Sequence, residues 1–381
     1  MVESDDGHFR IKITMKRIVL IGIITMFVMI ANAQIMLQVA TNAPLNKDKL
    51  AKKQINIPNI TQNKMYRNLR KMEVLDKKYI VRYHVKNDSM PDRLTCIENG
   101  TQYHYNLRKD SILIGGYQNR MTRVEYDLPE LYLRLPMALG DSLTGYYHGR
   151  GIYGDKLALR NYGWYKTKAE SLENLLLPEG DTLSNVLRIH TERLISSKYY
   201  PIEYMDSLMS FTEDSVQHYL KSDTAIIRAL IDRWYAIGYR YPILESRRIV
   251  NSTNEPLLSQ TLFFSPKEQQ DQLGGDIDNE KLRKEIIEKD DKQKQIGFSY
   301  QVFMDYDDVV LLEYQTEREL RLFYGLYSID GLKVYQKQER MVQPGHYSER
   351  INISGVKPGI YALNIIVDGQ IVTSEKIVIS K

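Results

Sequence analysis

The run KPGIYALNIIV at residues 357–367 is followed by Asp368-Gly369 and then by QIVTSEKIVISK at residues 370–381. Apolar, β-branched and aromatic residues dominate both runs, and this composition is typical of β-strands. An Asp-Gly pair between two such runs is a strong signal for a two-residue hairpin turn. Similar short runs, separated by turn residues, extend back to Phe298. The sequence therefore predicts that the chain ends in a small β-sandwich.

Length and composition limit the class of protein. The 381 residues exceed the usual size of one domain, so we expect two or three domains. Lys and Arg number 52 against 48 Asp and Glu, without a basic block, so nucleic acid is not expected as a partner. The 28 tyrosines against 8 phenylalanines favour half-buried strands. Cys96 is the only cysteine, which excludes an internal disulfide, and we expect it to pack as a small apolar residue.

The N-terminal segment has the features of a secretory signal peptide. A basic start at residues 15–17 precedes an apolar core at 18–30 and the small-residue cleavage site Ala-Asn-Ala at 31–33. We assign residues 1–33 to the signal peptide, with Met15 as an alternative start because acidic residues precede it. The apolar core is too short to span a bilayer, so no transmembrane segment is expected in the mature chain.

The rest of the chain divides by composition into four parts. We expect an extended lead-in at residues 34–75 and an antiparallel β-sandwich body at 76–265. A charged flexible linker is expected at 266–296, because this stretch lacks the aromatic residues that could offset its ordering entropy. Apolar residues between 277 and 287 leave a short helix there as an alternative. The fold class is all-β, with a C-terminal immunoglobulin-like β-sandwich of about seven strands at 297–381.

Two local patterns support antiparallel pairing in the body. Asn99-Gly100 separates two strand-like runs, which predicts a hairpin. Between residues 186 and 194, Leu187, Ile189 and Thr191 alternate with polar residues. This period of two predicts a strand with one packed face and one solvated face.

The C-terminal region resembles the sorting domains of proteins exported by the bacterial type IX secretion system. The resemblance rests on LYSIDGLKV at 326–334, ISGVKPGIY at 353–361, Asp368-Gly369, and EKIVISK at 375–381. It implies a seven-stranded sandwich that engages the export machinery and directs the protein across the outer membrane. The expected location is therefore outside the cell or on its outer surface, with the periplasm as the alternative.

The middle region resembles secreted β-domains without a known activity that precede such tails. The similar residues are LLLPEGDT at 175–182, NVLR at 185–188 and Trp234-Tyr235. This resemblance implies an architecture and leaves the function open.

Two motifs resemble ligand sites but depart from them in context. The run GRGIYG at residues 149–154 fits a dinucleotide-binding pattern, yet a strand-like run follows where that fold requires a helix. We therefore predict a glycine-rich β-turn. Asp276, Asp278 and Glu280 resemble a calcium loop, but Lys281 stands where the loop requires glycine, so we predict a solvated acidic segment.

We predict no metal, cofactor or catalytic residue. The histidines lack the close spacing of zinc ligands. Those considered are His84, His104, His148, His190 and His218.

Two other sets of residues could serve carbohydrates. One is a group of carboxylates from which a glycoside hydrolase could draw its catalytic pair, although spacing in the sequence does not fix their separation. These are Glu125, Asp127, Glu130 and Asp141. The second is a group of aromatic residues that could stack against a ligand, or equally pack in the core. These are Tyr153, Tyr162, Trp164 and Tyr165.

The sequence leads to one function hypothesis and one alternative. The first is a secreted or surface-exposed, non-enzymatic binding or structural protein of unknown ligand, with a glycan or a surface protein as its candidate partner. The alternative is a carbohydrate-active enzyme or carbohydrate-binding protein that uses acidic and aromatic residues of the body. A cleft with two convergent carboxylates would favour the enzyme.

Overall fold

The computed structural model describes residues 36–56, 69, 72–85, 89–178, 182–251, 253–271, 273–305 and 309–379. The predicted signal peptide, residues 1–33, lies outside the described residues. Two compact units divide the described chain, a body that extends to Ile287 and a C-terminal unit that begins at Glu288.

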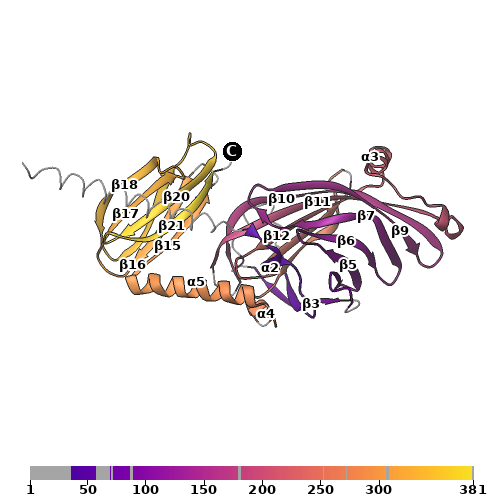
Figure 1. Ribbon diagram of the computed structural model, residues 1–381, viewed down its shortest axis with the longest axis horizontal. Coiled ribbons are helices and arrows are strands. Elements are labelled where there is room, and N and C mark those ends of the chain that lie inside the picture. The colour runs from indigo at the N-terminus through magenta and orange to yellow at the C-terminus, as the bar shows by residue number, and fades with distance from the viewer. Residues whose placement is uncertain are drawn as a thin grey trace, which may run out of the picture. The chain divides into compact units, whose positions relative to one another are not determined.

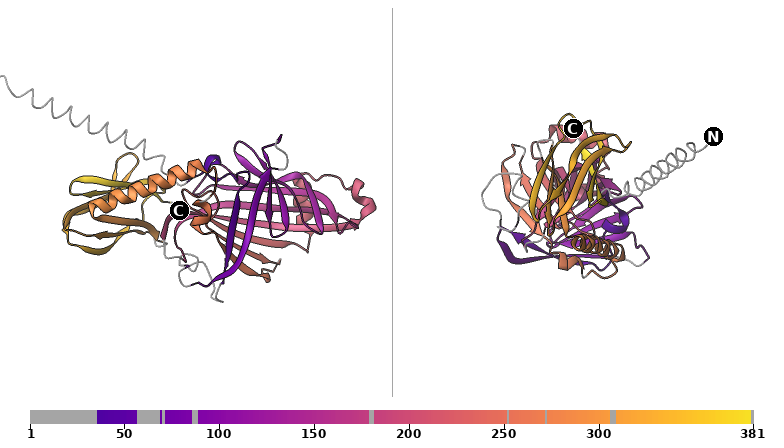
Figure 2. Two further views of the ribbon diagram at one scale, coloured as in Figure 1. Left: turned by 90° about the horizontal axis from the view of Figure 1, so that it is seen from below. Right: turned by 90° about the vertical axis from the view of Figure 1, so that its left-hand side faces the viewer.

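The body is a closed antiparallel β-barrel of twelve strands in the described chain (Figure 1 and Figure 2). The strands are β2 (Lys49–Ile55), β3 (Val74–Val85), β4 (Arg93–Glu98), β5 (Thr101–Leu107), β6 (Ser111–Gln118), β7 (Thr122–Arg134), β9 (Ser142–Tyr153), β10 (Leu157–Leu176), β11 (Thr182–Pro201), β12 (Ile227–Tyr235), β13 (Leu244–Val250) and β14 (Pro256–Phe264). Their order around the barrel is β10-β11-β12-β13-β14-β2-β3-β4-β5-β6-β7-β9.

The expectation of a sandwich body is wrong, because the sheet closes on itself. Strand β14 pairs with β2, and β7 pairs with β9, so each barrel strand has two neighbours. Closure removes the free edges that an open sheet exposes. The lead-in predicted at residues 34–75 also differs, since it contributes β2 and the start of β3 to the barrel wall.

The local strand signals are confirmed. Asn99 and Gly100 have φ values of 49° and 73°, and the flanking residues Glu98 and Thr101 pair directly across the hairpin. In β11, Leu187, Ile189 and Thr191 are 0%, 2% and 6% exposed, whereas the residues between them are only half-buried. The packed face points into the barrel.

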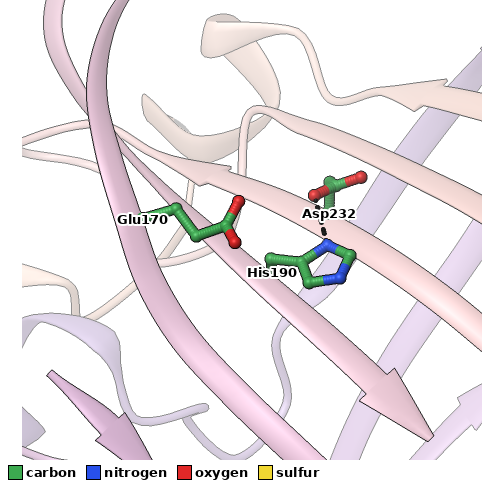
Figure 3. Close-up of side chains that lie close together, drawn as sticks. All are labelled: Glu170, His190 and Asp232. Carbon is green, nitrogen blue, oxygen red and sulfur yellow. Dashed lines mark hydrogen bonds and ion pairs between the residues drawn. The ribbon is translucent and has the colours of Figure 1, made fainter. Parts of the chain in front are cut away.

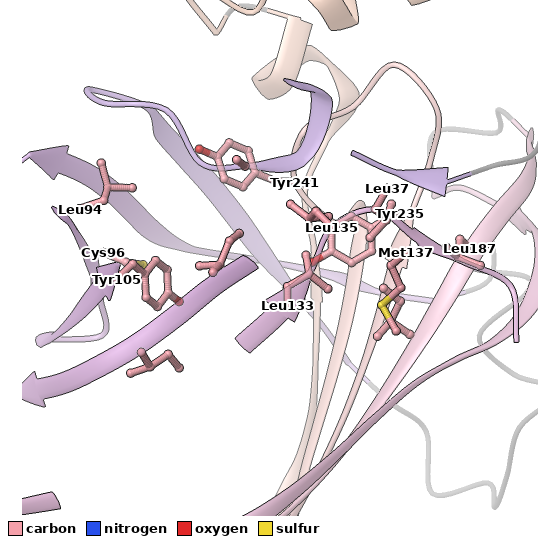
Figure 4. Packing of buried hydrophobic residues seen from close by; sticks show 14 of the residues in the cluster. Leu37, Leu94, Cys96, Tyr105, Leu133, Leu135, Met137, Leu187, Tyr235 and Tyr241 are labelled. Carbon is pink, nitrogen blue, oxygen red and sulfur yellow. The ribbon is translucent and has the colours of Figure 1, made fainter. Parts of the chain in front are cut away.

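Residues 36–48, which we call the N-terminal strap, cross one end of the barrel. The strap contains β1 (Met36–Leu37), which pairs with β8 (Met137–Ala138), and the short helix α2 (Val39–Asn42). Leu37 packs there in an apolar cluster with Leu133, Met137 and Tyr235 (Figure 4). The strap end of the barrel is therefore closed by apolar packing.

A buried arginine holds the strap end together. Arg240, in the turn between β12 and β13, donates hydrogen bonds to the carbonyl oxygens of Ala43 (2.6 Å) and Ala40 (2.7 Å). Its Nε and Nη2 atoms lie 3.1 and 2.5 Å from Asp276 Oδ1. Asn279 donates to the carbonyl oxygen of Thr41 at 2.8 Å. The strap, the turn and residues 276–279 are thus joined by one polar network.

The segment predicted as a flexible linker is largely helical. It forms α4 (Lys267–Asp271) and α5 (Ile277–Ile296), so the helix left open by the sequence is present and longer than expected. Spaced charges support it, since Lys284 Nζ lies 2.7 Å from Glu280 Oε1 one turn away. The buried partners of Asp276 and Asn279 fix its first turn, which composition alone does not reveal.

The segment between β11 and β12 lies on the outside of the barrel against β9 and β10. It contains a 3-10 helix, η2 (Ile202–Ser207), and the helix α3 (Glu213–Ser222). Thr212 caps α3 by accepting a hydrogen bond from the backbone N–H of Ser215.

The C-terminal unit contains seven strands in the described residues, arranged as two sheets. One sheet has the order β15-β16-β19 and the other β18-β17-β20-β21. The strands are β15 (Phe298–Asp305), β16 (Val309–Thr316), β17 (Leu320–Ser328), β18 (Lys333–Val342), β19 (Gly345–Asn352), β20 (Gly359–Val367) and β21 (Gln370–Ile379). Buried residues from both sheets form one core. The Asp368-Gly369 hairpin is confirmed, with φ values of 51° and 79°.

The strap-end network gives a stability prediction. Replacing Arg240 by Met leaves Asp276 buried without its cationic partner, and we expect the free energy of unfolding to fall by about 3–5 kcal/mol. The control Lys284→Met breaks an ion pair between exposed side chains and should cost less than about 1 kcal/mol. Urea denaturation measures both changes. Equal effects of the two substitutions would contradict the role assigned to Arg240.

Candidate functional site

The inside of the barrel contains a cavity of about 240 Å³ whose wall combines apolar side chains with several charged ones. Barrels wider than about eight strands leave interior space that side chains do not fill. The residues that line it include Lys52, Glu98, Glu130, Arg193, Arg233, Glu245 and Arg247, with Tyr83, Tyr103, Tyr105, Tyr132, Tyr235 and Tyr241. Charged groups from several strands thus converge on one space inside the barrel.

Four of these side chains form a ring of ion pairs. Lys52 Nζ lies 3.1 Å from Glu98 Oε1 and 3.6 Å from Glu245 Oε1. Arg247 closes the ring, with Nη2 2.8 Å from Glu98 Oε2 and Nε 2.6 Å from Glu245 Oε1. Arg233 Nε adds a contact of 2.8 Å to Glu245 Oε2. We call Lys52, Glu98, Glu245 and Arg247 the charged ring.

The charged ring keeps both carboxylates ionised. Burial opposes ionisation of Glu245, but Arg247, Lys52 and Arg233 outweigh it and hold its pKa well below the usual range. Burial likewise opposes ionisation of Glu98, but Lys52 and Arg247 outweigh it and lower its pKa. Neither carboxyl is therefore suited to donate a proton at neutral pH.

A separate ion pair joins Arg193 and Glu130. The Nη2 atom of Arg193 lies 2.6 Å from Glu130 Oε2. Burial raises the pKa of Glu130 in spite of this contact. The Nε atom of Arg193 is buried and has no hydrogen-bond partner among the described residues.

A second cavity of about 200 Å³ adjoins the first. The two share Tyr103, Ile114, Arg193 and Ile195 in their walls. The smaller cavity lies toward the end of the barrel opposite the strap, because residues next to the hairpin turns at 99–100 and 119–121 line it. Its tyrosines are Tyr103, Tyr117, Tyr126 and Tyr147.

Cys96 lies in the wall of the larger cavity. It projects from β4 and is 3% exposed, beside Tyr105 of the neighbouring strand (Figure 4). The expected small buried residue is confirmed. Burial raises the pKa of its thiol to about 12.

The four aromatic residues predicted to stack against a ligand do not share one surface. Tyr162 is fully buried on the outside of the barrel, where its hydroxyl donates to Asp223 at 2.6 Å. Tyr165 points inward and is 6% exposed, and Trp164, the next residue along β10, faces outward and is half-buried. Tyr153 is 38% exposed near the end of β9 and packs edge-on against Tyr199.

The four candidate carboxylates are also dispersed. Glu130 points into the barrel, whereas Asp127 contacts His148, which lies on the outer face. Asp141 accepts a hydrogen bond from the backbone of Ala138, and Glu125 is exposed. These four residues do not form a convergent pair.

Asp127 and His148 form a close pair beneath the segment that joins β11 and β12. His148 Nδ1 lies 2.5 Å from Asp127 Oδ1, and the imidazole ring stacks on Phe211. Burial lowers the pKa of His148, although Asp127 acts in the opposite direction. The guanidinium of Arg160 also lies over the Phe211 ring, 3.8 Å from its centroid. These contacts hold residue 211 and its neighbours on the barrel wall.

One group of residues in the described chain brings three metal-ligating atoms within 4.8 Å of one another. It consists of Glu170, His190 and Asp232 (Figure 3). Arg188 already serves both carboxylates, with Nη2 2.8 Å from Asp232 Oδ1 and 3.8 Å from Glu170 Oε2. A metal ion would have to displace this guanidinium, so the geometry is that of an ion-pair network.

The glycine motif at residues 149–154 lies mostly within β9, not in the turn that we expected. A Cβ atom at Gly151 would lie 1.9 Å from the backbone oxygen of Arg123, and one at Gly149 would lie 2.7 Å from that of Glu125. These glycines allow β7 and β9 to approach closely.

Sequence reasoning missed the charged ring and Arg193. Lys52, Glu98 and Glu245 come from three different strands, so no local spacing joins them. The sequence did carry a signal for Arg193. It lies two residues after Thr191 in β11, so its side chain is on the same packed face. An arginine on a packed face indicates a polar interior.

The comparison with protein families assigns the C-terminal unit. Residues 307–380 match the secretion system C-terminal sorting domain. No curated protein matches the chain. The C-terminal region is therefore a sorting domain of the type IX secretion system, and the protein is exported to the cell surface or beyond. The expected family resemblance and location are confirmed.

None of the helices in the described ranges combines the length and the apolar composition needed to cross a membrane.

The pKa values of His190 and His148 are expected to shift in opposite directions. The hydrogen bond to Asp232 raises the pKa of His190, whereas burial lowers that of His148. In an NMR titration, His190 should therefore titrate above about 6.5 and His148 below it. Because the folded-state pKa of His190 is raised, its contribution to stability is complete below the unfolded-state pKa and is lost as pH rises through the folded-state pKa.

The variant His190→Gln tests whether the stabilising contribution of His190 decreases as pH rises. Its loss of unfolding free energy relative to wild type should be larger at about pH 5.5 than at about pH 8.5. A loss that grows with pH, or a His190 that titrates below His148, would contradict the assignment.

Proposed function

We propose that the protein is an exported, non-enzymatic binding protein whose barrel holds a small polar ligand. The sorting domain delivers the barrel to the cell surface or the medium. The observation that carries this proposal is the cavity of about 240 Å³ inside the barrel, into which the charged ring projects.

Stability alone does not account for such an interior. A buried ion pair gains little over well-packed apolar residues, because desolvation offsets the Coulomb attraction. The side chains of Arg247 and Arg193 nevertheless keep 29% and 22% of their surface accessible. Since both residues line the cavity, this surface supports contact with water or with a ligand inside the barrel.

The same geometry argues against the alternative of a carbohydrate-active enzyme. Glycoside hydrolysis needs one carboxyl with a raised pKa beside a second that acts as base or nucleophile. Glu98 and Glu245 are close together, but cations neutralise both and their pKa values are lowered. Glu130 has a raised pKa but is held by Arg193. Binding therefore suits these groups better than proton transfer.

Labelling of Cys96 tests whether small molecules enter the barrel. We expect a small disulfide reagent such as dithiodipyridine to label the folded protein faster than the protein unfolds globally. A maleimide attached to a long polyethylene glycol chain should react only at the unfolding rate. Because the pKa of this thiol is about 12, labelling by the small reagent should rise about tenfold per pH unit near neutrality.

The proposal fails if the small reagent also reacts only at the unfolding rate. The interior would then be sealed to solutes, and its polar wall would have a structural role alone.

Deletion of residues 297–381 tests the export role of the tail. The body has its own apolar cores, so the truncated protein should fold and remain in the periplasm. Cell fractionation locates the protein, and circular dichroism checks its β-structure. Folded, truncated protein in the medium or at the cell surface would reject the delivery role of the tail.

A further inference from the structure

We infer that the ligand is a six-membered ring bearing one carboxylate, and that Arg193 binds the carboxylate where the two cavities meet. This inference rests on the proposed binding function and specifies the class of ligand. It arises from an unpaired donor, the balance of charge in the barrel and the composition of the smaller cavity.

The unpaired donor is Nε of Arg193. It is buried and has no hydrogen-bond partner among the described residues, although Nη2 of the same guanidinium contacts Glu130. A buried donor without a partner is costly and uncommon in folded proteins. A carboxylate oxygen placed against Nε would satisfy it with a charge-assisted hydrogen bond.

The charges in the wall of the larger cavity favour a ligand with a single negative charge. In the ion-pair network on the wall of the larger cavity, Lys52 and three arginines face three glutamates. Two further arginines line this wall: Arg240 is paired with Asp276, and Arg248 is exposed to solvent. The buried carboxyl of Asp48, at the strap end, accepts a hydrogen bond from Tyr241, and burial raises its pKa. One monoanion would therefore balance the network.

The smaller cavity suits the ring of such a ligand. Among the described residues that line it, Arg193 is the only charged one, and its partner Glu130 lines the larger cavity instead. Four tyrosines and two asparagines also line it, which offers aromatic faces and neutral hydrogen-bonding groups. A cavity of about 150 Å³ is enough for benzene, so one of about 200 Å³ accepts a six-membered ring.

Two sources could supply this chemistry, an acidic sugar and an aromatic acid. Isothermal titration of the full mature protein with sodium glucuronate and with sodium benzoate distinguishes them. At least one acid should bind with saturation. Its neutral counterpart, glucose or benzyl alcohol, should bind at least tenfold more weakly.

Matched double variants locate the site. Glu130→Gln with Arg193→Gln removes the inner pair without leaving a single buried charge, and should weaken binding of the acid at least tenfold. The control, Glu192→Gln with Arg228→Gln, removes an ion pair of 2.6 Å from the outer face of β11 and β12. It should leave the dissociation constant within about twofold.

If the first variant does not fold, Arg193→Lys serves in its place. Lysine keeps the charge beside Glu130 but removes Nε, and should give the same tenfold loss. The inference is overturned if neither acid binds, if the neutral rings bind equally well, or if the inner variants bind like wild type. In all three cases, if the small reagent still labels Cys96, the proposed binding function is not contradicted and only the class of ligand is wrong.

Discussion

Closure of the sheet is the constraint on which the rest of the body depends. Once β14 pairs with β2 and β7 with β9, every barrel strand has two partners and the sheet acquires an inside. Twelve strands enclose more space than their side chains fill, and the interior therefore contains cavities. Closure also removes exposed strand edges, an advantage for a protein that must stay unaggregated during export.

The two ends of the barrel differ, and this asymmetry gives the interior a direction. Arg240 and Asp276 join the N-terminal strap, the β12–β13 turn and the start of α5 into one closed end. The smaller cavity lies toward the opposite end, next to hairpin turns. Arg193 lines both cavities, and its Nε atom has no hydrogen-bond partner among the described residues. A ligand that entered from the hairpin end would meet this arginine before the charged ring.

Local signals predicted much of the strand structure but not the architecture. Asn99-Gly100 has its own turn chemistry, so neighbouring residues alone define that hairpin. The barrel depends instead on pairs such as Leu262 with Ile55, which are distant in sequence and carry no local mark. The charged ring was missed because its members also come from strands that are distant in sequence. Arg193 could have been found from its place on the packed face of β11. The strands of the C-terminal sandwich were recognisable from hairpins such as Asp368-Gly369, although β16 pairs with β19 and β17 with β20 across longer connections.

The most direct test of a ligand-binding interior is a crystal structure of the mature protein grown with sodium glucuronate or sodium benzoate. We expect density for the acid inside the barrel, with a carboxylate oxygen about 2.7–3.2 Å from Arg193 Nε. An interior filled by side chains, with Arg193 Nε bonded to protein and no acid inside, would contradict it.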